Sequence, residues 1–235
     1  MDNNDHFKKS VSGKNYLYFS AVCAFITVLT TIAIHNIHVP PGNFEESVKL
    51  YKNNLYLLLN WIILFHCLMV LFSMLGIALV IEKHFRALAI LGFIFFSLFV
   101  FSEWERTLNH LWHINGLRKK FAVTVDENML QFLRFEIQHR LYQSNVNFLL
   151  FTIGFSLGNA CYGLAIITNK GLDRLLGAGL LLWCCFTTCA FIYDFYPAKW
   201  LGSIVDACNK YYQPIIRFAI AYWLLQKARN LQSSG

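Results

Sequence analysis

Acidic, basic and imidazole side chains recur on one side of a segment that is otherwise apolar. The segment covers residues 102–115, and its polar members are Glu103, Arg106, His110 and His113. At about 100° per residue, their spacing places all of them within an arc of about 80° on an α-helix. Carboxylates and imidazoles at an apolar boundary are costly unless they pair with each other, with a metal ion or with a ligand. This stripe is therefore the first candidate functional site.

A second polar stripe follows in residues 126–145. It consists of Glu136, His139, Arg140 and Gln143, which also share one face of a helix. Glu136 and His139 have the Glu-x-x-His spacing that helices use to bind carboxylate-bridged metal pairs. A complete site of that kind needs a second such pair, which the sequence lacks.

The two stripes together hold enough ligands for a single divalent transition metal ion. Three or four nitrogen and oxygen ligands are sufficient for zinc or copper, and imidazole with carboxylate also suits iron and manganese. These ligand types favour none of the four metals decisively. The predicted metal ligands are Glu103, His110, His113, Glu136 and His139.

A structural interpretation competes with the metal site. Glu103 can pair with Arg106 three positions further on, and Glu136 can pair with Arg140 four positions further on, as neighbours on a helix do. The histidines would then line a polar interface between helices. We favour this structural network, followed by a metal or cofactor site and then by a path for protons, ions or a substrate.

The surroundings of the stripes indicate a membrane protein. Hydrophobic residues make up 57% of the 235-residue chain and charged residues only 14%, whereas soluble domains carry about 25% charge. Several stretches approach the roughly 20 apolar residues with which a helix crosses a bilayer. The predicted fold is an all-α integral membrane protein, a bundle of five or six transmembrane helices with an amphipathic helical hairpin on one membrane face. The predicted spans are 16–34, 55–81, 87–113, 146–168, 175–193 and 199–225.

The chain is predicted to form a single transmembrane domain. This domain covers residues 16–230, between a disordered polar tail, 1–15, and a short polar tail, 231–235. Charged residues and Pro214 interrupt the last segment, 199–225. We therefore expect a kinked or partly interfacial helix there.

Basic residues lie beside the apolar segments, which indicates their partner. A net charge of +7 would suggest nucleic acid for a soluble chain. Here the expected partners are the anionic headgroups of a lipid bilayer and an apolar small molecule, and no nucleic acid. Gly154 and Gly158 lie on one side of the fourth predicted span and suit close helix packing. We favour packing within the chain, against the fifth span, over a seam between copies in a homo-oligomer.

The short connections between spans predict the orientation of the chain. Connections 82–86 and 169–174 contain basic residues and share a side with the N-terminus, so the positive-inside rule places the N-terminus in the cytoplasm. The basic run 118–120 lies on the other side and argues against this orientation. The same topology adds further polar residues to the face of the stripes, with His66 beneath them. The members of this additional polar site are His35, His38, His66, Arg106, Arg140 and Asp194.

Two classes of function remain open, and with them the question of whether the protein is an enzyme. In the first class, the stripes bind a metal ion and act on an apolar substrate dissolved in the membrane. In the second, the protein is a non-catalytic membrane component, a small transporter or a partner-binding subunit, and the stripes are structural. The chain has no Gly-x-x-x-x-Gly-Lys-Ser/Thr run and no His-Glu-x-x-His run. It therefore carries neither the P-loop of ATPases nor the zinc motif of metalloproteases.

Overall fold

Helices make up all the regular structure in the part of the chain that the structure describes. The structure is a computed structural model, and it describes the backbone of residues 3–37 and 41–233 and the side chains of residues 13–37, 41–144 and 146–231. The all-α prediction is thus confirmed. In chain order the elements are α1 (Asn3–Asn36), α2 (Phe44–Lys49), η1 (Leu50–Lys52), α3 (Asn54–Leu108), η2 (Asn109–Ile114), α4 (Asn115–Phe121), α5 (Glu127–Ile167), α6 (Leu172–Phe195), α7 (Lys199–Ala207), η3 (Cys208–Tyr212) and α8 (Gln213–Ser233).

By length and composition, four of the described helices could cross a membrane. They are Gly13–Asn36, Asn54–Phe121, Glu127–Ile167 and Leu172–Phe195. This finding is compatible with the predicted integral membrane protein. Helix α1 begins at Asn3, so it includes most of the segment that the sequence predicted as a tail.

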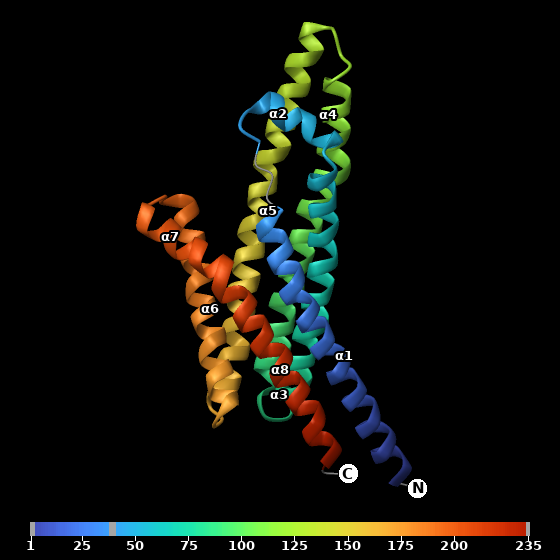
Figure 1. The fold of residues 1–235 in the computed structure, drawn as a ribbon, viewed down its shortest axis with the longest axis vertical. Coiled ribbons are helices and arrows are strands. Elements are labelled where there is room, and N and C mark those ends of the chain that lie inside the picture. The colour runs from blue at the N-terminus through green and yellow to red at the C-terminus, as the bar shows by residue number, and fades with distance from the viewer. Residues whose placement is uncertain (1–2, 38–40, 234–235) are drawn as a thin grey trace.

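Helix α3 reverses its direction at Phe85. The backbone of Phe85 has φ −136° and ψ 52°, which breaks the helical hydrogen bonding. We call residues 54–84 the first arm and residues 86–108 the second arm. The arms run side by side in opposite directions, because the indole Nε1 of Trp104 donates to the carbonyl oxygen of Leu64 at 3.0 Å. Both arms are visible in Figure 1, where the chain turns back below the α3 label.

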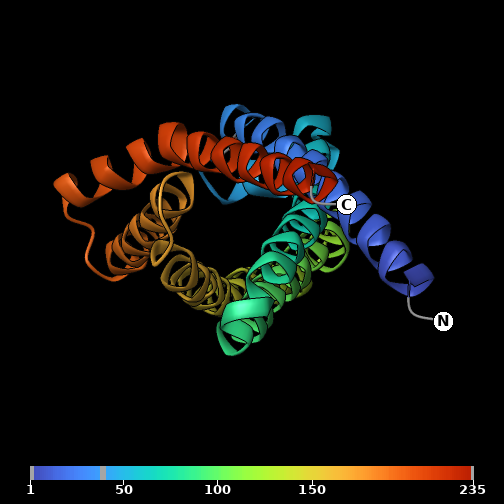
Figure 2. The same ribbon diagram turned by 90° about the horizontal axis from the view of Figure 1, so that it is seen from below.

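The long helical segments form a ring. Seen along the long axis, α1, α8, α6, α5 and the arms of α3 surround a central space (Figure 2). Both termini lie at one end of the molecule, the terminal end, whereas α4 and the start of α5 lie at the other, the hairpin end (Figure 1). Packed side chains fill the ring towards the terminal end. Those at most 1% exposed include Met74, Ile77, Tyr162, Leu180 and Leu224.

Close packing of α5 on the second arm of α3 depends on Gly154. A Cβ atom at this position would lie 2.7 Å from the carbonyl oxygen of Phe95 and 2.8 Å from the backbone nitrogen of Phe99. Gly158 faces the ring of Phe96 on the same arm. Helix α5 also packs closely on α6, the fifth predicted span, because a Cβ atom at Gly163 would lie 3.0 Å from the carbonyl oxygen of Gly177. The predicted packing against the fifth span is thus found, and Gly154 and Gly158 add a close contact with the third.

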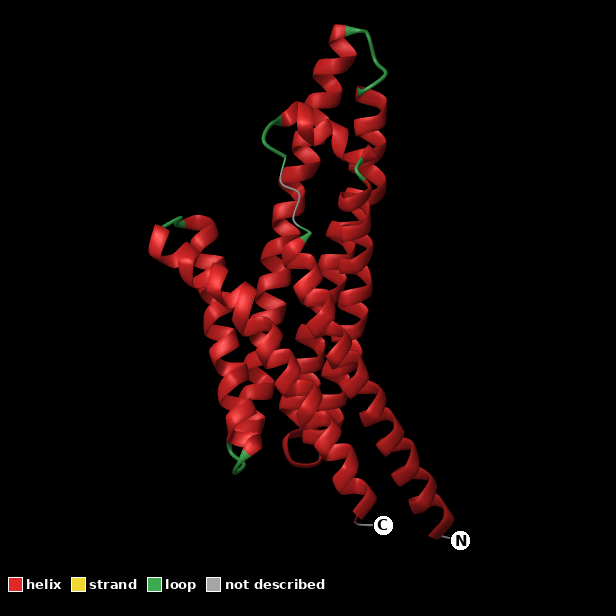
Figure 3. Ribbon diagram, viewed as in Figure 1, coloured by secondary structure: helices red, strands yellow, loops and turns green. Residues whose placement is uncertain are grey.

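The hairpin end extends beyond the ring and consists of α2, η1, α4, the start of α5 and the loops that join them (Figure 3). Arg118 of α4 is only 2% exposed and donates hydrogen bonds to Tyr56 Oη at 3.1 Å, Asn115 Oδ1 at 3.0 Å and Ser47 Oγ at 2.9 Å. It therefore joins α2, the start of α3 and α4. Asp126 caps α5 by accepting from the backbone nitrogen of Asn128 at 3.1 Å.

The last predicted span is a helix with a break near its start. Helix α7 continues into the π-helical η3 and then into α8. Pro214 follows directly after η3, and prolines and π-helical turns are the usual causes of a kink in a long helix. Helix α8 packs along α1, with the rings of Phe25 and Phe218 6.5 Å apart.

Candidate functional site

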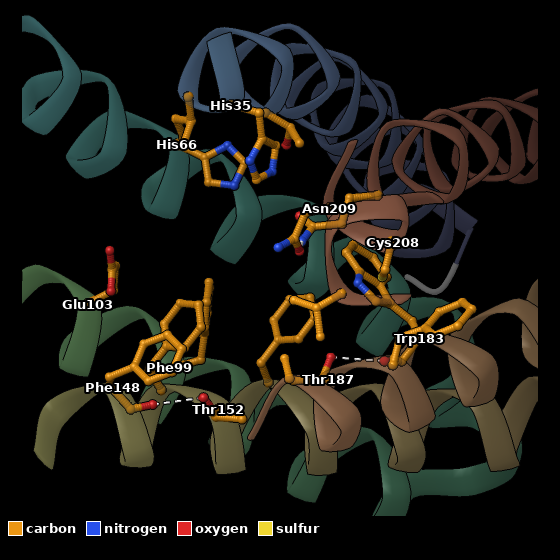
Figure 4. Close-up of a pocket in the computed structure, with 18 of the residues that line it drawn as sticks. His35, His66, Phe99, Glu103, Phe148, Thr152, Trp183, Thr187, Cys208 and Asn209 are labelled. Carbon is orange, nitrogen blue, oxygen red and sulfur yellow. Dashed lines mark hydrogen bonds between the residues drawn. The ribbon is translucent and has the colours of Figure 1, made fainter. Parts of the chain in front are cut away.

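A cavity of about 310 Å³ lies inside the ring. Residues of α1, both arms of α3, α5, α6, α7, η3 and α8 line it, and Figure 4 shows these side chains converging from opposite walls. The lining residues of α1 and α6 include the last turns of both helices, so the cavity lies towards the hairpin end. Its volume is at the lower limit of the roughly 300–1,000 Å³ found for small-molecule sites.

Five residues of the predicted sites line this one cavity. They come from α1, both arms of α3 and α6, segments that are far apart in the sequence. They are His35, His66, Glu103, Arg106 and Asp194.

Glu103 and Arg106 form an ion pair in the cavity wall. Arg106 Nε donates to Glu103 Oε2 at 2.8 Å, and Arg106 Nη2 donates to the other carboxylate oxygen. Glu103 is 5% exposed. The structural pairing predicted from the i, i+3 spacing is therefore present, and both oxygens of Glu103 are used within it.

His66 lies deep in the cavity. It is 7% exposed, and its Nδ1 atom lies 2.7 Å from the hydroxyl of Thr30 on α1. In Figure 4 His66 and His35 lie together, across the cavity from Glu103.

Arg217 of α8 also lines the cavity, and the sequence analysis assigned it no role. It is 3% exposed, and its Nε and Nη1 atoms have no hydrogen-bond partner among the described residues. Its guanidinium lies over the ring of Trp183, 5.0 Å from the centroid. A single arginine within a largely apolar segment is the sequence signal that could have marked it, because such residues face a protein interior or a water-filled space.

Aromatic rings form the apolar wall of the cavity. The ring of Phe155 lies 5.1 Å from that of Phe99 and 4.8 Å from that of Trp183, and Phe151 extends this wall at 4.7 Å from Phe99. In Figure 4 the imidazoles of His35 and His66 lie across the cavity from Phe99, and Glu103 lies beside Phe99. The cavity can therefore hold a molecule that has both a charged and an apolar part.

The predicted metal ligand His110 is engaged on both ring nitrogens. Its Nδ1 atom lies 3.2 Å from Tyr56 Oη, and its Nε2 atom lies 3.2 Å from Ser144 Oγ. His139 lies 3.0 Å from the amide nitrogen of Gln143 and stacks on Phe135. Both histidines thus have partners that are not metal ligands.

The other predicted ligands lie apart from these. His113 lines a separate groove of about 530 Å³ together with Arg140, which donates to Glu136 Oε1 at 3.0 Å. Across the described side chains, no group of three or more His, Cys, Asp or Glu residues is placed to hold a metal ion. His38 lies outside the described residues.

The π-helical η2 explains why the first stripe does not remain on one face. It includes His110 and His113, and a π-helix closes i→i+5 hydrogen bonds instead of the i→i+4 bonds on which the α-helical arc was calculated. The second stripe lies beside the packed face of α5, because Leu133 and Ile137 are the buried residues there. His139 is therefore left exposed.

A larger side cavity of about 950 Å³ adjoins the central one. The two share Arg106, Phe148 and Asp194 as lining residues. Exposed Tyr142 and Phe195 lie at the margin of the side cavity. A molecule can therefore approach the central cavity between α5 and α6.

Residues 154–158 read Gly-x-Ser-x-Gly but lie in the middle of α5. The nucleophile elbow of hydrolases with this pattern is a sharp turn between a strand and a helix. The hydroxyl of Ser156 lies 3.1 Å from Cys184 Sγ and 3.3 Å from Thr188 Oγ1. Ser156 therefore joins α5 to α6.

Comparisons with known protein families, with characterised proteins and with solved structures find no significant match for this chain. The functional argument rests on the geometry of the cavity.

Proposed function

We propose that the chain is an integral membrane protein with six crossing segments and a cytoplasmic N-terminus. The reversal at Phe85 supports counting the two arms of α3 separately, and the packing of α8 along α1 supports a sixth crossing. The basic connections 82–86 and 169–174 then lie in the cytoplasm. Arg118 is buried in a structural role, which weakens the contrary argument from the basic run 118–120.

The function that the geometry supports best is transport of a small amphipathic molecule, which binds in the central cavity as one step of that transport. The observation that carries this proposal is a cavity lined by both charged side chains and aromatic rings. It is reached from the hairpin end through the side cavity, whereas packed side chains fill the ring towards the terminal end. A binding site reached from one side and blocked towards the other is the arrangement that an alternating-access transporter needs.

Thiol labelling tests access to the cavity. In a cysteine-free background, Ala190→Cys places a thiol in the cavity lining, and a small membrane-impermeant thiol reagent should modify it in intact cells. The matched control is Ala165→Cys, because Ala165 is 0% exposed within the packed core and should stay unmodified. Failure to label Ala190→Cys from either side of the membrane would refute an accessible cavity.

A metal-dependent enzyme is the second candidate. One observation favours it, since His110 and His113 lie on a π-helical segment, a local structure that is frequent at functional sites. As they stand, the predicted ligands do not form a metal site. Elemental analysis of protein purified without a histidine tag decides between the candidates. We expect less than about a tenth of an equivalent of zinc, iron, manganese or copper per chain. If the protein instead contains about one equivalent of a metal, and His110→Ala abolishes its binding, the metal-dependent enzyme becomes the better proposal.

A further inference from the structure

The unpartnered guanidinium of Arg217 indicates which molecule the cavity binds. Arg217 is 3% exposed and lines the cavity. Trp183 covers one face of its guanidinium, which leaves the edges for hydrogen bonds, and Nε and Nη1 have no partner among the described residues. A buried charge of this kind is costly unless a counter-ion accompanies it.

The carboxylates of the cavity are not placed to neutralise Arg217. Both oxygens of Glu103 accept hydrogen bonds from Arg106. Asp194 is exposed and lies eleven positions beyond Trp183 on α6, about 16 Å along the helix axis. None of the ion pairs among the described residues includes Arg217. The missing counter-ion is therefore expected from a ligand.

A neighbouring amide adds a second donor for an anion. Gln213 Nε2 donates to Asn209 Oδ1 at 2.7 Å, which sets the orientation of the Asn209 amide. Asn209 Nδ2 makes no hydrogen bond within the described part of the chain. Asn209 and Gln213 both line the cavity with Arg217, so donors from η3 and α8 face the same space.

The aromatic wall requires an apolar part in the same ligand. Phe99, Phe151 and Phe155 line the cavity from two helices and continue to Trp183. Phe148, Phe151 and Phe186 also line the cavity and are only partly buried by the protein, and a free inorganic anion would leave their apolar surface uncovered. A long hydrocarbon chain would cover them and gain the free energy of burying apolar surface.

We propose that the central cavity binds an amphipathic anion, whose carboxylate or phosphate group pairs with Arg217 and Asn209 while its hydrocarbon part lies against Phe148, Phe151 and Phe186. This inference rests on the proposed function and names the class of molecule that the cavity holds. A guanidinium matches the geometry of carboxylate and phosphate oxygens.

Thermal unfolding of the purified protein in an uncharged detergent tests this assignment. Dodecyl phosphate and dodecanoate are the probes, and dodecanol and inorganic phosphate are the controls. At about 100 times the dissociation constant, a probe should raise the melting temperature of the wild type by about 5–10 °C. Arg217→Met should abolish the shift, whereas Arg229→Met, at an exposed position of the same helix, should retain it.

The same experiment contains the outcomes that contradict the proposal. An equal shift in Arg217→Met, or an equal response of the wild type to dodecanol, would overturn the anion site. Inorganic phosphate as effective as dodecyl phosphate would overturn the amphipathic ligand and assign the cavity to a soluble anion. Without probe, Arg217→Met should melt no lower than the wild type, because it replaces an unpaired buried charge with an apolar side chain of similar length.

A second measurement leaves Arg217 intact. Dodecyl phosphate should slow the modification of Ala190→Cys at least about tenfold, and inorganic phosphate should not slow it. A cavity that is labelled but not protected would overturn the anionic ligand and keep the proposed access route. A cavity that is never labelled would overturn the proposed function itself, so the two failures are distinguishable.

Discussion

At the scale of single residues, the Glu103–Arg106 pair supports the wall of the cavity. Removing the carboxylate leaves the guanidinium of Arg106, whose side chain is 31% exposed, without its counter-ion. We expect Glu103→Ala to lower the free energy of unfolding by about 1–3 kcal/mol, less than the loss for a fully buried pair because solvent partly screens Arg106. Thermal or denaturant unfolding in detergent measures this loss.

Glu105 provides the matched control for this substitution. It lies two positions away, is exposed, and accepts a hydrogen bond from Asn147 on the outside of the bundle. Glu105→Ala should change stability by less than about 1 kcal/mol. Equal losses in the two variants would show that the Glu103 pair does not stabilise the fold.

Some residue pairs could be predicted from the sequence, and others could not. The pairing of Glu103 with Arg106 follows from their spacing on one helix, which fixes their distance. The contact of Thr30 with His66 and the position of Arg217 over Trp183 join different helices. Their formation depends on which faces of the helices meet, and a hydropathy pattern does not specify that.

At the scale of elements, α3 shows what periodicity can and cannot predict. The apolar stretches 55–81 and 87–113 correspond to its two arms, and the turn at Phe85 falls within the predicted connection 82–86. The π-helical η2 was not predictable from an α-helical period. It changes the direction in which the side chain of His113 points. The predicted metal site depended on that direction, because it was inferred from an arc calculated for an α-helix.

Packing of α5 against the second arm of α3 gives a prediction at this scale. An added methyl group at Gly154 meets the backbone of Phe95 and Phe99 rather than a flexible side chain. Gly154→Ala should therefore lower stability by about 1–3 kcal/mol. The control is Gly116→Ala in α4, where a Cβ atom has nothing within 4 Å and better helix propensity should raise stability by up to about 1 kcal/mol. A stabilised Gly154→Ala would contradict the close approach of the two helices.

At the scale of the whole molecule, the orientation in the membrane is open to a direct measurement. Asn128 lies exposed at the hairpin end and Lys170 lies exposed at the α5–α6 turn. In a cysteine-free background, an impermeant thiol reagent added to intact cells should label Asn128→Cys and leave Lys170→Cys unlabelled until lysis. The reverse pattern would place the N-terminus outside.

The ring itself could not be derived from the sequence. Hydropathy indicated most of the helical segments, but six segments can be arranged around a centre in many orders. The observed order places α1 beside α8 and so brings residues from both ends of the chain to one cavity. The cavity is thus a property of the tertiary arrangement, whereas the stripes were a property of single helices.

The contact between α1 and α8 also has a consequence for biogenesis. Helix α1 is synthesised before α8, and the mutual packing of these two helices closes the ring. Loop closure across nearly the whole chain is entropically costly and slow compared with local pairing. Until α8 is in place, the face of α1 that packs on it stays uncovered. That interval is when a membrane chaperone or a quality-control protease would encounter this protein.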